Sequence, residues 1–528
     1  MRRLVLWMLL AWTSSDLAMH TAGAATDGGS FDPANADISA LRTALDSHRI
    51  TSEQLVRYYL RRIGLFDKQG PRINALITLN PRALDQAKQA DADAARGAAK
   101  GVLQGIPFIA KDNYDTAGIA TSGGSAALEH SVPSTNAFVV QRLLDRGAIL
   151  IGKANMSELA ASYGRLSYSS AGGLTLNPYD TARNVSGSSS GSAAAVAADF
   201  APFALGTDTS GSIRGPASVA GLVGLRPTLG LTSRSGVIPL ALAFDTTAAL
   251  TRTVADQAIV LDAIAGPDPD DAATRSIASG GYRPAFDPQA LRGARLGVVR
   301  NFRGANPDVD AAERSALRIL QAQGAVLVSV DLPKEFETLW DRVIGPVSTA
   351  EFKPQFERYL RTLPPGEPQT LARLIEISAS AAVMNSANPV NPPRLQALRE
   401  ADTTPLTESA VEIRIMTDVL PGIRRRLESL AADRRLRAFV FSTMSCPASP
   451  RFDRDDPTYV CRTDDPYKAS YIAAATGFPE VTVPMGLVTG NIPVGYSFLG
   501  LPHSESQLLG LANAFEKATP PLPPPPLH

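Results

Sequence analysis

Cysteine and histidine, which often hold metals in proteins, are scarce in this sequence. It contains two cysteines and five histidines: Cys446, Cys461, His20, His48, His130, His503 and His528. Two thiols cannot form a cysteine-only zinc site or an iron–sulfur cluster, and the histidines do not occur at metal-ligand spacing. We therefore expect no metal and no other cofactor, and few histidines are candidates for a Ser-His-Asp triad.

An excess of either charge is also missing. Lysine and arginine number 51 together, as do aspartate and glutamate, so the formal net charge is +0. Without a basic field the chain has no electrostatic attraction for nucleic acid. An aromatic content of 6% also offers few surfaces on which single-stranded bases could stack. We expect no nucleic-acid partner.

Long hydrophobic runs are absent except near the N-terminus. Two arginines precede the apolar run 4–12, and the small residues 22–24 match a signal-peptidase site. The run is too short to span a bilayer as a helix. We predict a signal peptide over residues 1–24, a single domain over residues 25–528, and a periplasmic or secreted protein without a stable membrane span. A disordered leader, with Met19 as a later start, is the alternative.

The two cysteines fit an exported protein, because disulfides persist in oxidising compartments. Cys446 and Cys461 bracket a segment rich in proline and aspartate, residues 447–457. A disulfide between them would restrain this irregular backbone. Two buried free thiols are an equally good interpretation.

Apolar spacing predicts that helices and strands alternate along the chain. Helices are expected, from apolar residues at i and i+4, over residues 38–66, 81–100, 138–146 and 311–323. Thr51 and Gln54 form a potential capping box within the first of these. Strands are expected over the short apolar runs 148–151, 296–299, 325–330, 438–441, 481–483 and 494–499. This alternation predicts an α/β fold in which helices cover both faces of a sheet.

Two segments depart from the alternation. Residues from about 335 to 430 are rich in helical patterns and are interrupted by proline-rich stretches at 363–366 and 388–393. They predict a helical insertion on the sheet. The tail, residues 519–528, is almost all proline and should be extended.

The serine-rich stretch 186–192 is the most unusual segment. A flexible linker is one interpretation, but the stretch runs directly into the alanine-rich residues 193–198, which favours a helix start. It also matches the G-x-S-x-G elbow of an α/β-hydrolase-type esterase, with Ser189 as nucleophile and His503 as base. Such an elbow follows an apolar strand, whereas residues 177–184 form a polar loop, so this is the weaker alternative.

Two further segments carry candidate chemistry. Lys111 ends the apolar stretch 105–110, and a buried lysine tends to lose its proton because desolvation destabilises the ammonium; a lysine that reaches the surface is the alternative. Residues 206–214 follow a short apolar strand, and their backbone N–H groups could bind an oxyanion. A match to the phosphate-binding GxxxxGK pattern at residues 147–153 is rejected, because Ala154 replaces the required Ser or Thr.

These segments together resemble the amidase signature family. The family has a lysine in a G-I-P-x-x-x-K-D-N stretch, a serine in G-G-S-S-G-G-S after N-P-x-D, and a serine in G-T-D-x-G-G-S-I-R. This sequence has Lys111, Ser188 and Ser212 at those places. The resemblance covers about residues 36–518, and its C-terminal part is similar to bacterial peptide amidases. In three places serine replaces a family glycine, which should keep the backbone unless a positive φ is needed: Ser186, Ser190 and Ser210.

The resemblance implies an amide hydrolase with an α/β/α sandwich fold and a central mixed sheet covered by helices. Ser212 would be the acylated nucleophile, Ser188 the bridging serine with a cis peptide bond, and Lys111 the base. Asp208 and Arg214 would brace the loop. The substrates would be a small-molecule or peptide amide and water.

The resemblance also implies the surroundings of these groups. An oxyanion hole would be formed by the backbone N–H groups of Thr209, Ser210 and Gly211. A loop near the substrate would contain Thr121, Ser122, Gly123 and Gly124, and a purely structural role is an equally good interpretation of this loop. A periplasmic binding protein that kept the fold without catalysis is the non-enzyme alternative, and the intact set of Lys111, Ser188 and Ser212 argues against it.

Overall fold

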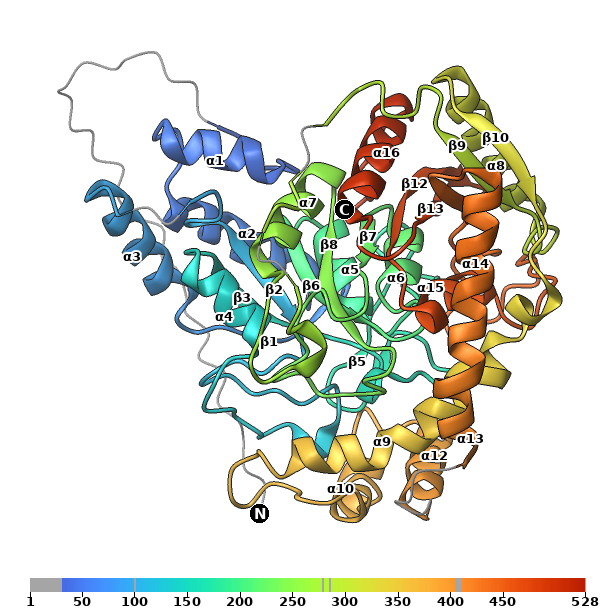
Figure 1. Ribbon diagram of the computed structural model, residues 1–528. Coiled ribbons are helices and arrows are strands. Elements are labelled where there is room, and N and C mark those ends of the chain that lie inside the picture. Colours follow the sequence, from blue (N-terminus) through green and yellow to red (C-terminus); the bar gives the residue numbers. More distant parts are fainter. Residues whose placement is uncertain (1–30, 99–100, 278–279, 284–285, 404–409, 528) are drawn as a thin grey trace, which may run out of the picture.

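A sheet of eleven strands runs through the molecule, which we describe from a computed structural model (Figure 1). The structure describes residues 31–98, 101–277, 280–283, 286–403 and 410–527. The expected signal peptide, residues 1–24, lies outside the described residues. The strands are β1 (Leu76–Leu79), β2 (Pro107–Lys111), β3 (Ile149–Ala154), β6 (Phe203–Asp208), β7 (Val223–Arg226), β8 (Thr246–Thr251), β9 (Arg295–Val299), β10 (Val326–Val330), β11 (Ala438–Ser442), β12 (Glu480–Val488) and β13 (Ile492–Leu499).

The sheet is mixed. Its strand order is β1-β3-β2-β6-β8-β7-β12-β13-β11-β9-β10. The neighbours β3, β2 and β6 run parallel, as do β11, β9 and β10, and the other neighbouring pairs are antiparallel. Two short strands, β4 (Tyr168–Ser169) and β5 (Gly173–Leu174), form a separate ribbon.

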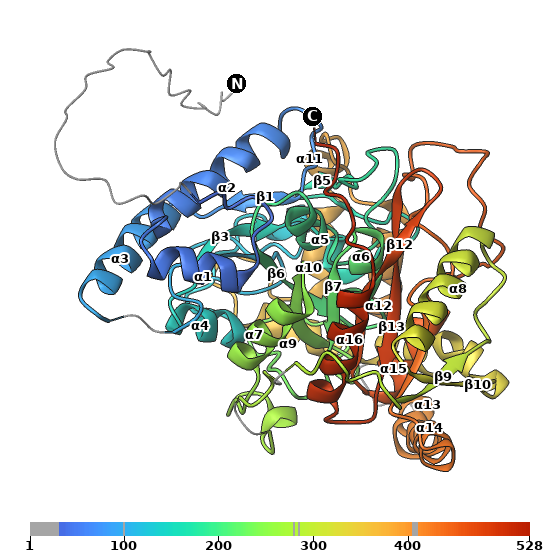
Figure 2. The same ribbon diagram turned by 90° about the horizontal axis from the view of Figure 1, so that it is seen from above.

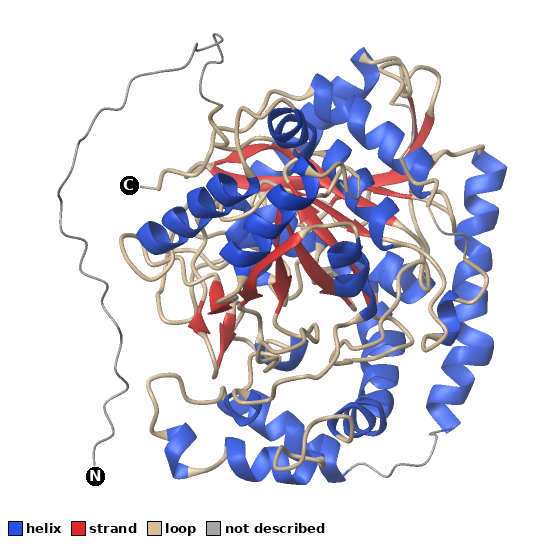
Figure 3. Cartoon of the chain, turned by 90° about the vertical axis from the view of Figure 1, so that its left-hand side faces the viewer, coloured by secondary structure: helices blue, strands red, loops and turns tan. Residues whose placement is uncertain are grey.

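Helices lie on both faces of the sheet (Figures 2 and 3). On one face α4, α7, α16 and α8 pack side by side, and on the other α5 and α6 pack against the central strands. Every residue of α5 and α6 is buried, so the rest of the chain encloses these two helices. This confirms the expected α/β/α arrangement. The helices of this part are α1 (Ile38–Asp46), α2 (Ser52–Phe66), α3 (Ala83–Ala95), α4 (Phe138–Asp145), α5 (Ser190–Ala197), α6 (Arg214–Val219), α7 (Val254–Ile264), α8 (Pro307–Ala322), α15 (Tyr471–Thr476) and α16 (Glu505–Ala518).

The helix predicted over residues 38–66 is two helices, α1 and α2. The chain turns at His48, where φ is 55°, and Thr51 begins α2 with the capping box to Gln54 that its sequence indicates. The apolar spacing continues across this turn, because both helices face the same core, and so the spacing alone does not reveal the break. The helix predicted over residues 81–100 is also shorter, since α3 ends before Gly97, where φ is 72°.

Between β10 and β11 the chain forms helices that lie beyond one edge of the sheet, as Figure 1 shows. A separate hydrophobic cluster joins α9, α10 and α12 to Leu128, Leu159 and Ile238, which belong to loops between strands. Helices α9, α10 and α12 therefore cover the loops at that edge. The helices between β10 and β11 are α9 (Gly345–Leu360), α10 (Leu371–Ser378), α11 (Ala381–Met384), α12 (Pro392–Thr403), α13 (Ala410–Arg414) and α14 (Leu420–Arg434), with π-helical turns η5 (Trp340–Ile344) and η6 (Ile415–Val419).

Shorter elements complete the fold. Single 3-10 turns occur at η1 (Ala126–Leu128), η2 (Glu158–Ala160), η3 (Ala272–Thr274), η4 (Lys334–Glu337) and η7 (Lys468–Ser470). The proline-rich tail runs without regular structure over residues 519–527, and Tyr179 Oη donates a hydrogen bond to the carbonyl oxygen of Pro523. Over the described ranges, no helix is long and apolar enough to cross a membrane.

Candidate active site

Two parallel strands bring two of the predicted site segments together. Ala110 of β2 pairs with Leu205 of β6, so both strands end at the same edge of the sheet, with Lys111 and Asp208 as their last residues. Binding sites in α/β sheets form at the carboxyl ends of parallel strands. This edge is the one that the helices between β10 and β11 cover (Figure 1).

Lys111 is completely buried at this edge. Its Nζ lies 2.8 Å from Ser188 Oγ and 2.7 Å from Thr207 Oγ1. Burial lowers the pKa of Lys111 to about 7, against weaker opposing effects of Asp208 and Asp245. Both partners are hydroxyls, which can donate as well as accept. Lys111 can therefore be neutral near neutral pH without losing its hydrogen bonds.

The serine-rich stretch forms a tight loop and the first turn of α5. The peptide bond between Gly187 and Ser188 is cis, and the N–H of Ser189 donates to the carbonyl oxygen of Ser212 at 3.2 Å. At Gly191 an added Cβ would lie only 2.4 Å from the carbonyl oxygen of Asn155, so only glycine fits there. The loop is thus hydrogen-bonded both to Asn155, which follows β3, and to the loop that carries Ser212.

One of the three serines that replace family glycines lies at a position that favours glycine. Ser186 has a φ of 62°, whereas Ser190 and Ser210 have no positive φ. The N–H of Ser186 donates to Asn184 Oδ1 at 2.7 Å, and its Oγ shares a hydrogen bond with Tyr467 Oη. A glycine could make the first of these hydrogen bonds through its backbone, but the bond to Tyr467 needs the serine side chain and adds to what holds Ser186 in its left-handed conformation.

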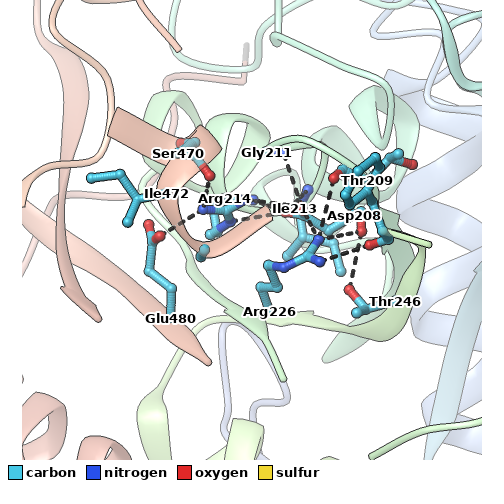
Figure 4. Close-up of polar contacts among 12 residues, drawn as sticks. Asp208, Thr209, Gly211, Ile213, Arg214, Arg226, Thr246, Ser470, Ile472 and Glu480 are labelled. Atoms are coloured by element: carbon cyan, nitrogen blue, oxygen red, sulfur yellow. Dashed lines mark hydrogen bonds and ion pairs between the residues drawn. The ribbon is translucent and has the colours of Figure 1, made fainter. Parts of the chain in front are cut away.

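Ser212 lies in the turn between β6 and α6 and is 9% exposed. Figure 4 shows how Asp208 holds this turn: its carboxylate accepts the N–H of Gly211 at 2.8 Å and that of Ile213 at 3.1 Å, on either side of Ser212. Gly211 has a φ of 119°, and an added Cβ would lie 3.1 Å from Ser470. The turn therefore depends on this aspartate and this glycine.

The bond from Gly211 corrects the expected oxyanion hole. Its N–H was expected to face the substrate together with those of Thr209 and Ser210, but it is already donated to Asp208. Aspartate side chains commonly accept N–H groups a few residues further along the chain, and the spacing from Asp208 to Gly211 would have permitted this inference. Thr209 and Ser210 stay as predicted donors.

A network of buried ion pairs surrounds Asp208 (Figure 4). Arg214 contacts Asp208 at 3.0 Å and Glu480 at 2.6 Å, and Arg226 contacts Asp208 at 3.0 Å. All four side chains are fully buried. Burial opposes ionisation of Asp208, but the two arginines and the backbone donors outweigh it and hold the pKa of this carboxyl well below its usual range.

The sequence predicted the bracing role of Asp208 and Arg214 but not that of their partners. Glu480 of β12 lies opposite Arg226 of the neighbouring strand β7 in the register of the sheet. The available signal for these two partners was that each is a charged residue at the end of a short apolar run. A second aspartate, Asp245, accepts a 2.6 Å hydrogen bond from Thr209 Oγ1 and so fixes the other end of the Ser212 loop.

Lys153, which ends the rejected phosphate-binding pattern, is a second fully buried lysine. Its Nζ donates to the Tyr114 carbonyl oxygen at 2.8 Å and to Thr121 Oγ1 at 2.7 Å, and it lies 3.4 Å from Asp112 Oδ1. Burial lowers the pKa of Lys153, but a carboxylate and a carbonyl oxygen stabilise its ammonium. Lys153 is therefore a structural cation.

A cavity of about 560 Å³ opens onto Ser188 and Ser212. Its walls come from the two serine loops, from residues 157–166, and from η5, α9 and α12. Five aromatic residues line it: Tyr163, Trp340, Phe352, Tyr467 and Tyr471. Two charged residues line it as well, Arg394 and Glu400.

The loop that was expected to touch substrate does not line this cavity. Thr121 accepts the hydrogen bond from Lys153, and the N–H groups of Ser122 and Gly124 donate to Asp112 Oδ2 at 3.0 and 3.3 Å. Hydrogen bonds to Asp112 therefore hold the loop beneath the active site and away from the cavity. Four residues take this supporting position: Thr121, Ser122, Gly123 and Gly124.

The esterase alternative is not supported by the arrangement of its residues. Ser189 Oγ is buried and donates to the carbonyl oxygen of Thr207 at 3.2 Å. His503 is exposed at the start of α16, and its N–H donates to Thr228 Oγ1. The cavity wall contains neither side chain.

The two cysteines are joined, with 2.03 Å between the sulfurs of Cys446 and Cys461. The loop between them reaches the residues just before the serine-rich stretch: Asn184 Nδ2 donates to the carbonyl oxygen of Ser449 at 2.9 Å, and Arg183 pairs with Asp456. In the part of the chain that the structure describes, no group of three or more His, Cys, Asp or Glu is arranged to hold a metal ion.

Sequence relatives point to one family. The profile described as Amidase matches residues 54–509. A glutamyl-tRNA(Gln) amidotransferase subunit of Caldanaerobacter subterraneus is 34% identical over 487 residues, which cover 91% of this chain and 96% of that protein. A probable amidase of Arabidopsis thaliana is 33% identical over 506 residues, or 93% of this chain and 91% of the other.

Solved structures agree. The native peptide amidase of Stenotrophomonas maltophilia superposes with a TM-score of 0.83 at 37% identity and covers 93% of this chain and 98% of its own. An amidase family protein of Bacillus anthracis gives a TM-score of 0.81 at 29% identity, with 93% and 92% covered. The chain therefore belongs to the amidase family, and it is an enzyme that hydrolyses amides.

Proposed function

We propose that this enzyme cleaves its substrate through an acyl-enzyme on Ser212, with Ser188 as the bridging serine and Lys111 as the base. One observation carries the proposal: the buried Nζ of Lys111 lies 2.8 Å from Ser188 Oγ, and Ser188 and Ser212 line one cavity. A serine hydroxyl is a weak nucleophile until a neighbouring base takes its proton. A lysine with a pKa of about 7 can be that base at neutral pH.

Thr207 and Asn113 favour proton transfer from Ser188 to Lys111. Thr207 Oγ1 lies 2.7 Å from Lys111 Nζ and accepts a hydrogen bond from Asn113 Nδ2 at 3.1 Å. A hydroxyl oxygen can accept twice, so Thr207 can accept from both neighbours. One N–H of neutral Lys111 then points at Thr207, and the nitrogen lone pair is left for the O–H of Ser188.

The proposed cycle moves one proton along this chain of groups. Ser188 gives its proton to Lys111 and takes that of Ser212, whose Oγ forms a bond to the substrate carbonyl carbon. The oxyanion is received by backbone N–H groups of Thr209 and Ser210, a type of donor worth roughly 10²–10³ in rate. The proton then returns through Ser188 to the amine nitrogen as the C–N bond breaks.

Water completes the reaction by the same route. It gives a proton towards Lys111 through Ser188, and its oxygen attacks the ester carbonyl carbon on Ser212. The ester bond breaks, Ser212 regains its proton, and the carboxylic acid leaves. The products are one acid and one amine for each amide and water consumed.

We propose peptide-like amides as the substrates. The aromatic lining of the cavity suits amino-acid side chains, because aromatic rings supply large apolar contact area. The 37% identity to a peptide amidase supports the same class. Hydrolysis of N-acetylated dipeptide amides, followed by mass spectrometry, tests this class against simple aliphatic amides.

Adduct mapping tests the nucleophile. The protein is treated with a fluorophosphonate, digested, and analysed by mass spectrometry. We expect the phosphonyl group on Ser212, no labelling of Ser212→Ala, and full labelling of Ser189→Ala. An adduct on Ser189 would instead support the esterase alternative and refute the proposal.

We also propose that the enzyme is exported. The composition of residues 1–24 supports this, and so does the Cys446–Cys461 disulfide, since disulfides persist in oxidising compartments. Expression of the full chain in a Gram-negative host, with N-terminal sequencing of the periplasmic fraction, tests the idea. A full-length protein confined to the cytoplasm would contradict it.

A further inference from the structure

Arg394 is a buried cation in the wall of the active-site cavity. It is 3% exposed, lies in the first turn of α12 and lines the same cavity as the two catalytic serines. Asn391, at the start of this helix, donates its Nδ2 to the carbonyl oxygens of Ser162 and Tyr163, both at 3.0 Å. The start of α12 is therefore tied to residues 162 and 163 of the cavity wall, which restrains the position of Arg394.

Two aromatic rings flank the guanidinium. Its Cζ lies 5.3 Å from the ring centre of Tyr163 and 5.2 Å from that of Phe352. A guanidinium is weakly hydrated and stacks well on aromatic faces. Contacts of this kind cover its faces and leave its N–H groups, which point outward in the plane, for hydrogen-bond acceptors.

Those N–H groups are poorly matched within the described part of the chain. Arg394 Nη2 donates to the carbonyl oxygen of Leu159 at the long distance of 3.4 Å, the guanidinium also interacts with the side chain of Tyr163, and Nε has no hydrogen-bond partner there. A guanidinium has five N–H donors, and buried donors without acceptors are unfavourable. A ligand with acceptor oxygens in the cavity would satisfy them.

The acidic residues near Arg394 do not neutralise its positive charge. Glu158 acts on Arg394 electrostatically, but among the described residues the two form no ion pair within 4.0 Å, and burial raises the pKa of Glu158. Glu400 also lines the cavity, but it is exposed at the other end of α12 and accepts a hydrogen bond from Gln396. The cavity is therefore positive at its buried end.

We infer that Arg394 binds a carboxylate on the acyl part of the substrate, so that the enzyme prefers acidic amides to their uncharged isosteres. A carboxylate matches the planar donors of a guanidinium in a two-point hydrogen bond. The inference names the substrate class of the proposed function and relies on that function only for the place of the scissile amide at Ser212.

Matched substrates test the inference. We would measure kcat/KM for N-acetylated dipeptide amides that carry Glu or its isostere Gln at either position. We expect Glu to be favoured at one position by about tenfold or more, since a charged carboxylate accepts a stronger hydrogen bond from a guanidinium than an uncharged amide does. Arg394→Gln should bring the ratio of the two rates near one, which is the loss of a tenfold preference, or about 1.4 kcal/mol.

Two further variants make the test specific. Arg394→Lys keeps the charge without the planar donors, and should retain part of the preference. Arg399→Gln removes an exposed arginine from the same helix and should leave the ratio unchanged. Equal rates for Glu and Gln substrates in the natural protein, or a preference that survives in Arg394→Gln, would overturn the inference.

Binding separates this inference from the proposed mechanism. Calorimetry of the same peptide amides with Ser212→Ala protein, with and without Arg394→Gln, needs no turnover. When Arg394 is present, we expect the Glu peptide to bind about tenfold more tightly than the Gln peptide. With Arg394→Gln, we expect the two peptides to bind equally. Arg394-dependent binding without any hydrolysis by the natural protein would refute the mechanism alone. Hydrolysis without that dependence would refute the inference alone.

Discussion

At the residue scale, two buried lysines in neighbouring strands have different chemistry. Lys153 is surrounded by a carboxylate and carbonyl oxygens, whereas Lys111 contacts two hydroxyls. The sequence identified Lys111 through its motif. It could not identify Lys153 as buried, because a lysine at the end of an apolar strand is as often directed to the surface.

The pH dependence of activity follows from Lys111. As the proposed base, Lys111 would act only when neutral, and its pKa is about 7. We therefore expect kcat/KM to fall about tenfold per pH unit below pH 7 and to be level above it. Steady-state rates on one amide between pH 5 and 9 check this. A rate that rises on acidification would contradict it.

Thr207→Val should move that profile. The ammonium form of Lys111 needs acceptors more than the neutral form does, so losing the Thr207 hydroxyl disfavours the charged form. The pKa of Lys111 should fall and the acid limb should move to lower pH, while the plateau drops because the lone pair is no longer directed at Ser188. Ser192→Ala, which removes a buried hydroxyl bonded to Leu205, is the control and should leave the profile unchanged. An identical profile in Thr207→Val would refute the role given to Thr207.

Asp208→Asn should destabilise the fold strongly. The substitution leaves Arg214 and Arg226 buried without their shared carboxylate, and breaking a buried pair in this way typically costs about 3–5 kcal/mol. Urea unfolding followed by circular dichroism measures the loss. The exposed Asp46, which pairs with Arg42, provides the control, and Asp46→Asn should cost less than about 1 kcal/mol. Equal effects of the two substitutions would contradict the bracing role.

At the scale of the elements, the sequence predicted the strands better than the helix ends and the loops. Short apolar runs identified β3, β9, β10, β11, β12 and β13. Strands buried on both faces consist almost wholly of apolar residues, and all of these except the partly exposed edge strand β10 are largely buried. The break between α1 and α2 was missed because both helices face one core. The bond from Gly211 to Asp208 was missed because it depends on the turn of the backbone, which apolar spacing does not describe.

The disulfide belongs to this scale, since it closes one loop. Cys446 and Cys461 are 15 residues apart, and closing a loop of that length stabilises a protein by about 3 kcal/mol. We expect the double variant Cys446→Ser/Cys461→Ser to unfold at lower urea concentration while kcat/KM at 25 °C stays within about twofold. The second expectation rests on the contacts of Asn184 and Arg183 with the same loop. An unchanged urea concentration of unfolding would contradict the expected loss of stability. A variant that is folded but inactive would contradict the expected activity.

At the scale of the whole molecule, the site lies between the sheet edge and the helices that follow β10. The sheet supplies Lys111 and the two serine loops, and the added helices supply the wall with Arg394 and Phe352. The motifs in the sequence predicted the first group, because each has a fixed spacing. The individual residues of the wall could not be predicted, since they come from segments that are far apart in the chain and carry no motif.

The central claim is that Lys111, and not a histidine, activates the serines. The most direct test compares kcat/KM of Lys111→Ala and His503→Ala on one amide, with circular dichroism to verify folding. We expect Lys111→Ala to lose about 10²–10⁴-fold, the usual contribution of a positioned base, and His503→Ala to match the natural enzyme. An active Lys111→Ala together with an inactive, folded His503→Ala would contradict the claim.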